Sequence, residues 1–291
     1  MKHCRFLTFP LLFIFPACSG PDAHFCRDFG IDELYLCDTD SLEVISLELA
    51  KIPAGINVND ILSEVDGYDS DGNDLEADTL GIQLLMMRGK GSREPSIERY
   101  RLLLEAGFHL KHQTFSGVST LHWCVSSTSG NATTECVTFL LDSGAPIDLP
   151  DHFGQTPLLA AIFGSGRKET KANHVPLLIA RGADVNLSDN RGQSPLAVAS
   201  QNHQVENVRI LLEAGANVNH QDSIDGSTAL LKVLESGGGL LARNEVINLL
   251  VEAGADVNAT RKDGNTVLSL ASKYNKDPGV IQLLVNAGAK R

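Results

Sequence analysis

The sequence lacks the motifs that build the common catalytic sites. It contains no Gly-x-Ser-x-Gly nucleophile elbow, no Walker-type loop, no His-Glu-x-x-His helix and no Rossmann fingerprint. The run Gly237-Gly238-Gly239 is not followed by the Lys-Ser or Lys-Thr of a phosphate cradle, so we interpret it as a linker. His109 and His112 have no third ligand beside them, which favours a solvated turn over a metal site. The sequence therefore predicts a non-catalytic protein without cofactor or metal.

Basic residues are scarce throughout the chain. There are 24 Lys and Arg against 36 Asp and Glu, which gives a formal net charge of −12. This excludes nucleic acid as a partner, because phosphate backbones require a basic surface, and no small-molecule substrate is expected. Residues 21–78 hold sixteen acidic residues and only Arg27 and Lys51 of opposite sign. Such a run is typical of a solvated acidic face, and a basic partner surface is the alternative.

Long apolar runs are scarce as well. Residues 6–15 form one that follows two basic residues and is about half of the roughly 20 residues of a membrane span, so a secretory signal is predicted over residues 1–17. The stretch Phe15-Pro16-Ala17-Cys18 resembles a bacterial lipobox, in which the cysteine becomes the lipid-modified N-terminus. Cys18 is the expected lipid attachment site, and ordinary secretion of a soluble protein is the alternative. Because Ser19 favours the outer membrane, we predict a periplasmic protein anchored there by lipid alone.

The chain has six cysteines, and none of them forms a Cys-x-x-Cys pair. No histidine cluster follows at ligand spacing, which argues against zinc. Four cysteines would remain beyond Cys18 in an oxidising compartment, and they fall into two local pairs. We predict the disulfides Cys26–Cys37 and Cys124–Cys136, with four buried thiols that act as small hydrophobes as the alternative.

A repeated phrase, Leu-Leu-x-x-Gly-Ala, dominates the C-terminal two thirds of the sequence. Its glycines are 38, 33, 39 and 34 residues apart, and apolar residues seven, four and three positions before each glycine form one face of a helix. A residue without Cβ readily takes the left-handed conformation that ends a helix. Each phrase leads through an extended polar stretch and a glycine turn to a Thr-Pro-Leu-like helix start. The phrases contain Gly144, Gly182, Gly215, Gly254 and Gly288.

This unit of turn, helix, loop and helix resembles the ankyrin repeat, whose period is about 33 residues. The resemblance covers residues 76–291 and implies an all-α solenoid of helix-turn-helix repeats with short hairpin-like turns, after an irregular N-terminal segment. His122 stands at the histidine of the family's Thr-Pro-Leu-His start, where the resemblance implies a structural imidazole that joins neighbouring turns. We predict an acidic segment or cap at 18–75, a degenerate unit that caps the array at 76–113, and full units at 114–150, 151–188, 189–221, 222–260 and 261–291.

Extra residues lengthen three of the five full units. From turn glycine to phrase glycine there are 23 residues in the third unit and 24 in the fifth, but 27 or 28 in the others. We place the additions in Gly-, Ser- and charge-rich loops between the paired helices, at residues 126–134, 164–173 and 236–244.

The resemblance implies that the turn tips and the first helices of the units hold a partner protein on a concave surface. Exposed aromatic residues dominate many protein interfaces, which makes Phe153 and Phe163 the preferred anchors. Alternatively, Phe163 packs beneath its long loop. The candidate binding residues at the variable positions are Phe115, His152, Phe153, Gln155, Phe163, Asn190, Arg191, Gln193, Ile224, Lys262, Asp263 and Tyr274.

Three functions fit these features. An exported, membrane-tethered and acidic ankyrin array resembles the immunity lipoproteins that neutralise secreted effectors such as phospholipases, and this is the leading specific hypothesis. A periplasmic scaffold or stress-protection factor is the second. The third belongs to another class, an enzyme that uses the acidic N-terminal segment.

Overall fold

The computed structural model describes residues 67–68, 74–75 and 97–290, except 106, 112, 114–115, 127–133, 166–172, 238 and 276. The backbone divides into two units, Met1–Ser116 and Gly117–Arg291. The predicted signal, the lipid site Cys18, the pair Cys26–Cys37 and the candidate Phe115 lie outside the described residues. The predictions for those residues therefore stay predictions.

The described residues of the first unit include two short strands and one helix. Strands β1 (Gly67–Tyr68) and β2 (Asp74–Leu75) pair antiparallel, within the predicted acidic segment. Helix α4 (Ile97–Glu105) ends at the degenerate copy of the repeated phrase. There the amide of Phe108 donates to the carbonyl of Leu103 at 2.9 Å, and Gly107 has a φ of +93°. The phrase therefore ends this helix by a left-handed glycine, as the sequence predicts.

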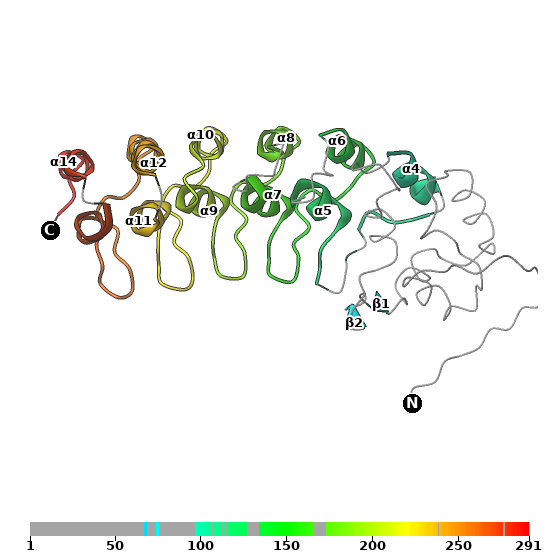
Figure 1. The fold of residues 1–291 in the computed structure, drawn as a ribbon, viewed down its shortest axis with the longest axis horizontal. Coiled ribbons are helices and arrows are strands. Elements are labelled where there is room, and N and C mark those ends of the chain that lie inside the picture. The colour runs from blue at the N-terminus through cyan, green and yellow to red at the C-terminus, as the bar shows by residue number, and fades with distance from the viewer. Residues whose placement is uncertain are drawn as a thin grey trace, which may run out of the picture. The chain divides into compact units, whose positions relative to one another are not determined.

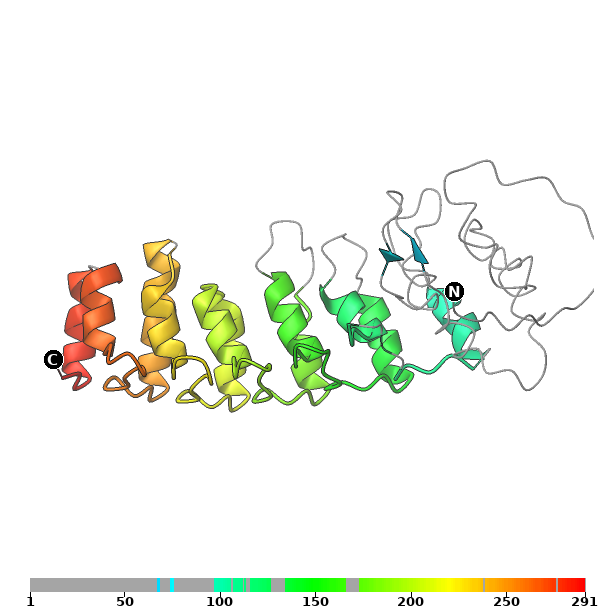
Figure 2. The same cartoon turned by 90° about the horizontal axis from the view of Figure 1, so that it is seen from below.

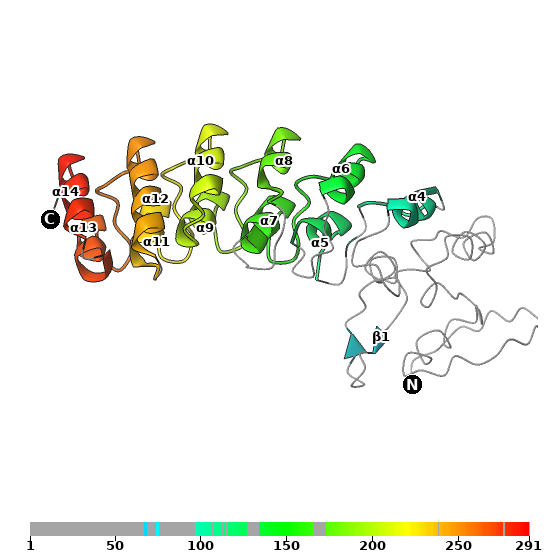
Figure 3. The same ribbon diagram turned by 45° about the horizontal axis from the view of Figure 1, so that its top comes forward.

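The second unit is an array of five helix pairs, which confirms the predicted all-α solenoid (Figures 1 and 3). The first helices of the pairs form an inner row, and the second helices form an outer row. The inner row is α5 (Thr120–Ser126), α7 (Pro157–Ser165), α9 (Pro195–Gln201), α11 (Ala229–Glu235) and α13 (Val267–Leu270), which continues as the π-helix η2 (Ala271–Asn275). The outer row is α6 (Thr134–Asp142), α8 (Val175–Ala180), α10 (Val205–Glu213), α12 (Leu240–Glu252) and α14 (Pro278–Asn286). None of the described helices is long and apolar enough to cross a membrane.

The inner helices begin where the sequence places their caps. The hydroxyl of Ser194 accepts from the amide of Ala197 at 3.2 Å, and Pro195 follows as the first helical residue, where its missing N–H costs nothing. Thr228 and Thr266 cap α11 and α13 in the same way. Fully buried side chains of both rows form one continuous apolar ribbon, and each buried leucine contributes about 2 kcal/mol. Its largest members include Leu121, Leu158, Leu196 and Leu230 of the inner row and Leu140, Leu178 and Leu211 of the outer row.

An asparagine ladder fixes the spacing between successive pairs. The side-chain oxygen of Asn186 accepts from the amide of Asn217 at 2.8 Å, and its nitrogen donates to the carbonyl of Gly215 at 3.4 Å. Asn219 and Asn258 repeat both bonds one unit further on each time. In the first pair Asp148 takes this position, and its carboxylate accepts from the amide of Asp184 at 3.1 Å. The asparagine of the recurrent Val-Asn pair thus supplies hydrogen-bond partners for one backbone amide and one backbone carbonyl of the next unit, which explains why it recurs.

One predicted insertion is placed differently by the structure. We expected residues 236–244 to form a loop, but α11 ends at Glu235 and α12 begins at Leu240. The added residues after Gly239 lengthen α12 to 13 residues, against 9 in α10. Leu, Ala and Arg are strong helix formers, so only residues 236–239 remain between the two helices. The other two predicted loops fall mostly on residues that the structure does not describe.

Candidate partner-binding surface

Three successive turns between units are each closed by an aspartate at their start. One carboxylate oxygen of Asp151 accepts from the amides of Phe153 and Gln155, both at 2.8 Å. Asp189 does the same for the amides two and four residues further on, at 2.9 and 2.8 Å. In the next turn, which is one residue longer, Asp222 accepts from the amides three and four residues further on, at 2.9 and 3.1 Å. Side chains at the turn tips therefore project from a backbone of fixed shape.

Each turn also bonds to the turn of the following unit. We call residues 151–155, 189–193, 222–227 and 261–265 the tip row; its turns extend from the inner helices on the side away from the outer row (Figures 1 and 2). The backbone amide of one turn donates to a carbonyl of the preceding turn. These bonds join Asn190 to Phe153 at 2.9 Å, Ser223 to Arg191 at 3.1 Å and Lys262 to Asp225 at 2.9 Å. The tip row is thus a continuous and stiff ledge along the array.

A glycine substitution tests how closely the turns must approach. Gly192 has a φ of +73°, and a Cβ at this position would lie 2.5 Å from the amide nitrogen of Ser223. Gly264 has a φ of +83° but no atom within 4 Å of such a Cβ. We expect Gly264→Ala to lower the free energy of unfolding by about 1–2 kcal/mol, the cost of the left-handed conformation alone. We expect Gly192→Ala to lower the free energy of unfolding in urea clearly more than Gly264→Ala does. Equal losses for the two variants would contradict the close contact between the turns.

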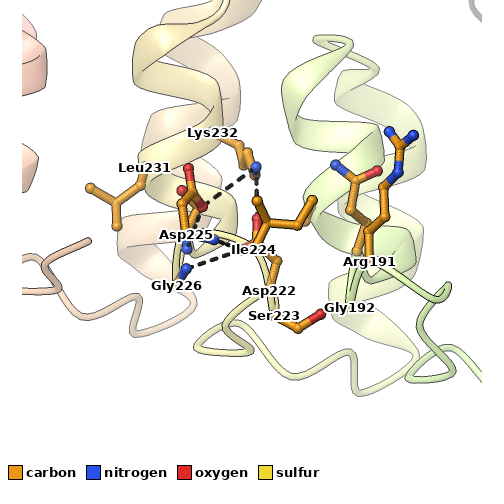
Figure 4. A network of polar contacts seen from close by, with 12 residues as sticks. Arg191, Gly192, Asp222, Ser223, Ile224, Asp225, Gly226, Leu231 and Lys232 are labelled. Atoms are coloured by element: carbon orange, nitrogen blue, oxygen red, sulfur yellow. Dashed lines mark hydrogen bonds and ion pairs between the residues drawn. The ribbon is translucent and has the colours of Figure 1, made fainter. Parts of the chain in front are cut away.

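Two apolar side chains stand exposed on the tip row. Phe153 is 66% exposed and Ile224 is 57% exposed. Figure 4 shows Ile224 on the turn next to that of Arg191, which is also exposed. Tyr274 lies exposed on η2, with the ammonium of Lys273 4.7 Å from its ring centroid. These four predicted binding residues are exposed to solvent, and so are His152, Asn190, Lys262 and Asp263.

Several other predicted binding residues take part in hydrogen bonds of the turns. The side-chain amide of Asn190 donates to the backbone carbonyl of His152 at 2.8 Å. The ammonium of Lys262 donates to the backbone carbonyl of Ser223 at 2.7 Å. Asp263 accepts from the backbone and side chain of Asn265, which lowers the pKa of its carboxyl. Gln155 and Gln193 are half-buried in turn hydrogen bonds, and Phe163 is half-buried on α7. These residues thus lie within the ledge, and whether they also contact a partner stays a prediction.

His122 joins two units through both of its ring nitrogens, as predicted for a structural imidazole. Nδ1 lies 2.8 Å from the hydroxyl of Ser119, and Nε2 donates to the carbonyl of Gln155 at 2.8 Å. Burial lowers the pKa of the imidazole despite the bond to Gln155. The ring is therefore neutral at physiological pH and links α5 to the next turn.

A buried ion-pair network lies behind the tip row, and sequence reasoning missed it. The ammonium of Lys232 on α11 lies 2.7 Å from Asp222 and 3.8 Å from Asp225 (Figure 4). The guanidinium of Arg261, in the next turn, bonds to Glu235 and lies 3.6 Å from Asp225. The side chain of Asp222 is 1% exposed and that of Lys232 is 12% exposed. The desolvated Lys232–Asp222 pair thus lies within the fourth unit. Arg261 couples this unit to the fifth through Asp225 and Glu235, whose side chains are 34% and 42% exposed.

The sequence did contain a signal for this network. Lys232 stands on α11 at the position that holds Ala160, Val198 and Leu270 in other units. Arg261 stands where the other turns begin with an aspartate. A charge at an apolar position of a repeat requires a partner, because a buried lone charge is costly.

The network is expected to make the free energy of unfolding of the solenoid depend on pH. Burial alone would raise the pKa of Asp222, but hydrogen bonds from Lys232 and from the amide of Asp225 lower it to about 2. An unfolded aspartate has a pKa near 3.9, so the unfolded chain binds more protons between about pH 4 and pH 2. We expect this residue to contribute about 2 kcal/mol above pH 4 and to lose that contribution as the pH falls toward 2. The free energy of unfolding of Asp222→Asn, measured in urea, should therefore approach that of the native protein at low pH. A difference between the two proteins that does not change with pH would contradict this.

A serine and a histidine also meet between α11 and the α9–α10 loop. The hydroxyl of Ser236 lies 2.8 Å from Nε2 of His203 and donates its own hydrogen to the carbonyl of Val233 at 2.9 Å. Burial, and then the charge of Arg243, lowers the pKa of His203. A catalytic serine needs a base that takes its proton and a group that stabilises the imidazolium. This contact meets neither condition, so we interpret it as structural. Within the described residues, no cluster of three or more metal-ligating side chains is found.

The predicted pair Cys124–Cys136 is brought together on α5 and α6. The sulfur atoms lie 3.1 Å apart, and both residues are buried thiols in this structure. The two helices thus place the sulfurs of the predicted disulfide in contact, and the bond itself stays a prediction.

Comparison with known proteins identifies the repeats. Residues 121–222 match the family model for ankyrin repeats in three copies. The chain is 53% identical over 60 residues to ankyrin repeat and SOCS box protein 6 of Homo sapiens, which covers 20% of this chain and 14% of that protein. It is 30% identical over 177 residues to putative ankyrin repeat protein FPV232 of Fowlpox virus, which covers 60% of this chain and 34% of that protein.

A bacterial relative matches over more of its own length. The chain is 29% identical over 155 residues to putative ankyrin repeat protein YahD of Escherichia coli, which covers 53% of this chain and 74% of that protein. By contrast, the chain spans only about a seventh of the length of the human relative and a third of the viral one. Residues 121–222 therefore match ankyrin repeats, and the five stacked helix pairs of residues 117–291 have the fold of an ankyrin solenoid, a repeat architecture that commonly serves protein–protein interaction.

Proposed function

We propose that the chain is a binding protein that holds a partner protein on the tip row and on the inner helices beside it. The observation that carries this proposal is the exposure of Phe153 and Ile224 on a ledge of hydrogen-bonded turns. Exposed apolar side chains on a soluble protein mark interaction sites when they lie on one surface. A stiff ledge also loses little conformational freedom on binding, so more of the contact energy appears as affinity.

The charges of the network support recognition by shape and apolar contact. Lys232 and Arg261 already have acidic partners within the solenoid, so they are not available to attract an acidic protein. Arg191 is exposed between the two apolar tips and can contribute one polar contact. We therefore propose an apolar partner patch that is bound with weak dependence on salt.

The proposed location is the bacterial envelope, and sequence features alone support it. Residues 1–17 have the pattern of a signal, and Cys18 ends a stretch similar to a lipobox. The proposed specific role is immunity, in which the solenoid covers a secreted effector such as a phospholipase. Expression of the effector in cells with and without the chain tests this role, and equal killing in both would reject it without rejecting protein binding.

Capture of the partner tests the proposed function directly. The full-length protein is immobilised and exposed to envelope and cytosolic extracts, and retained proteins are identified by mass spectrometry. The purified candidate is then titrated into the chain at 50 and 500 mM salt. We expect saturable binding that weakens little at high salt. A catalytic turnover by the chain with no saturable protein partner would contradict the proposal.

A further inference from the structure

A buried cysteine pair occupies the first helix pair and has no equivalent in the others. Cys124 stands five residues after the cap of its helix, and Cys136 stands eight residues before the phrase glycine. Counting in the same way gives Ala161 with His174, Ala199 with Asn207, Val233 with Val246, and Ala271 with Val280 in the later units. All these positions are buried between the two rows. Two sulfurs therefore replace an ordinary core contact in one unit alone.

The contact has the arrangement that a disulfide needs. A disulfide forms only between side chains that converge, and here the two sulfur atoms lie 3.1 Å apart with α5 and α6 in place. We propose that Cys124 and Cys136 form an intramolecular disulfide that locks α5 to α6 when the chain meets an oxidising disulfide donor. This inference is independent of the proposed function, because it requires no partner.

The chemistry is thiol–disulfide exchange with a donor such as glutathione disulfide. The thiolate of one cysteine attacks the donor, whose S–S bond breaks, and a mixed disulfide forms while one donor thiol leaves. The thiolate of the second cysteine then attacks the mixed disulfide, which forms the Cys124–Cys136 bond and releases the second donor thiol. The chain loses two protons and two electrons, which together are two hydrogen atoms, and the donor gains them.

Burial determines when this exchange takes place. Both cysteines are buried between the helices, so a donor reaches them only while α5 and α6 are apart. Oxidation is therefore fast during folding and slow in the folded protein, and the finished bond is shielded from reductants. The bond closes a short loop, for which the chain-entropy account predicts about 100-fold slower amide exchange in α5 and α6 when opening of this pair governs exchange.

The test uses the full chain with Cys4, Cys18, Cys26 and Cys37 replaced by serine. The protein is unfolded in urea and refolded in a mixture of reduced and oxidised glutathione, and then alkylated, digested and analysed by mass spectrometry without reduction. We expect the peptides that contain Cys124 and Cys136 to be joined, at a mass lower by two hydrogen atoms. Amide exchange is compared between this form and its reduced form.

The matched control carries Cys124→Ala and Cys136→Val. These substitutions introduce the residues that the fifth unit has at the equivalent positions, Ala271 and Val280. It should fold, stay unlinked and show no change in amide exchange on oxidation. If Cys124 and Cys136 are both alkylated after refolding, or if they link two chains, the proposal is overturned. A linked pair together with failure to capture any protein would leave this inference standing and reject the proposed function.

Discussion

Replacing Phe153 by aspartate is expected to weaken partner binding by about 30-fold or more. Phe153 is the most exposed aromatic side chain among the described residues and stands on a turn held by Asp151 and by the next turn. An aromatic anchor of this type typically contributes 2 kcal/mol or more to an interface. A carboxylate at the same place would have to be desolvated against an apolar patch. The affinity is measured by titration of the purified partner.

A second substitution controls for the loss of an exposed apolar side chain. Leu241 is 88% exposed at the start of α12, in the outer row and away from the tip row. We expect Leu241→Asp to leave the affinity within about twofold of the native protein, because the outer row makes no contact in the proposed complex. Both variants should retain the native helix content by circular dichroism. Equal affinities for the Phe153 and Leu241 variants would show that the partner binds elsewhere.

Replacing Lys232 by methionine is expected to destabilise the solenoid by about 3 kcal/mol or more. Methionine fills much of the same volume but leaves the carboxylate of Asp222 buried without its cation. Removal of one partner from a buried ion pair typically costs 3–5 kcal/mol, because the other charge remains desolvated. The loss is measured as the change in the free energy of unfolding in urea at pH 7.

The chain offers a matched pair that differs in burial. Arg181 lies 2.6 Å from Asp142, which is as close as Lys232 is to Asp222, but the two side chains are 34% and 62% exposed. We expect Arg181→Met to cost less than about 1 kcal/mol, because water screens this pair and solvates the carboxylate that remains. Similar losses for the two variants would contradict the view that burial makes the network stabilising. A double variant, Asp222→Asn with Lys232→Met, should recover part of the loss.

The regular part of the fold could be predicted because the sequence repeats its local signals. The cap, the apolar stripe and the phrase glycine recur together, so the helix ends near Ser194, Thr228 and Gly182 follow from backbone chemistry alone. The lengthened α12 was missed because glycines at 237–239 suggested a longer loop than the helix formers after them allow. Local propensity and repeat counting gave different answers there.

The candidate site was predicted less completely, and the reason is that exposure depends on neighbours. Phe153 and Ile224 are 66% and 57% exposed, as expected for variable positions at the turn tips. Lys262 is exposed, and sequence reasoning did not foresee that its ammonium donates to carbonyls of the preceding turn. The partner of Lys232 lies ten residues earlier in the chain, in a turn that sequence alone does not fold against α11.

Amide hydrogen exchange on the complex with the captured partner tests the central claim most directly. The claim is that a ledge of linked turns presents an apolar surface to another protein. We predict slower exchange on binding in the four turns of the tip row and in the first residues of the inner helices, with no change in α8, α10 and α12. Protection confined to the outer row, or to residues before Gly117, would contradict it.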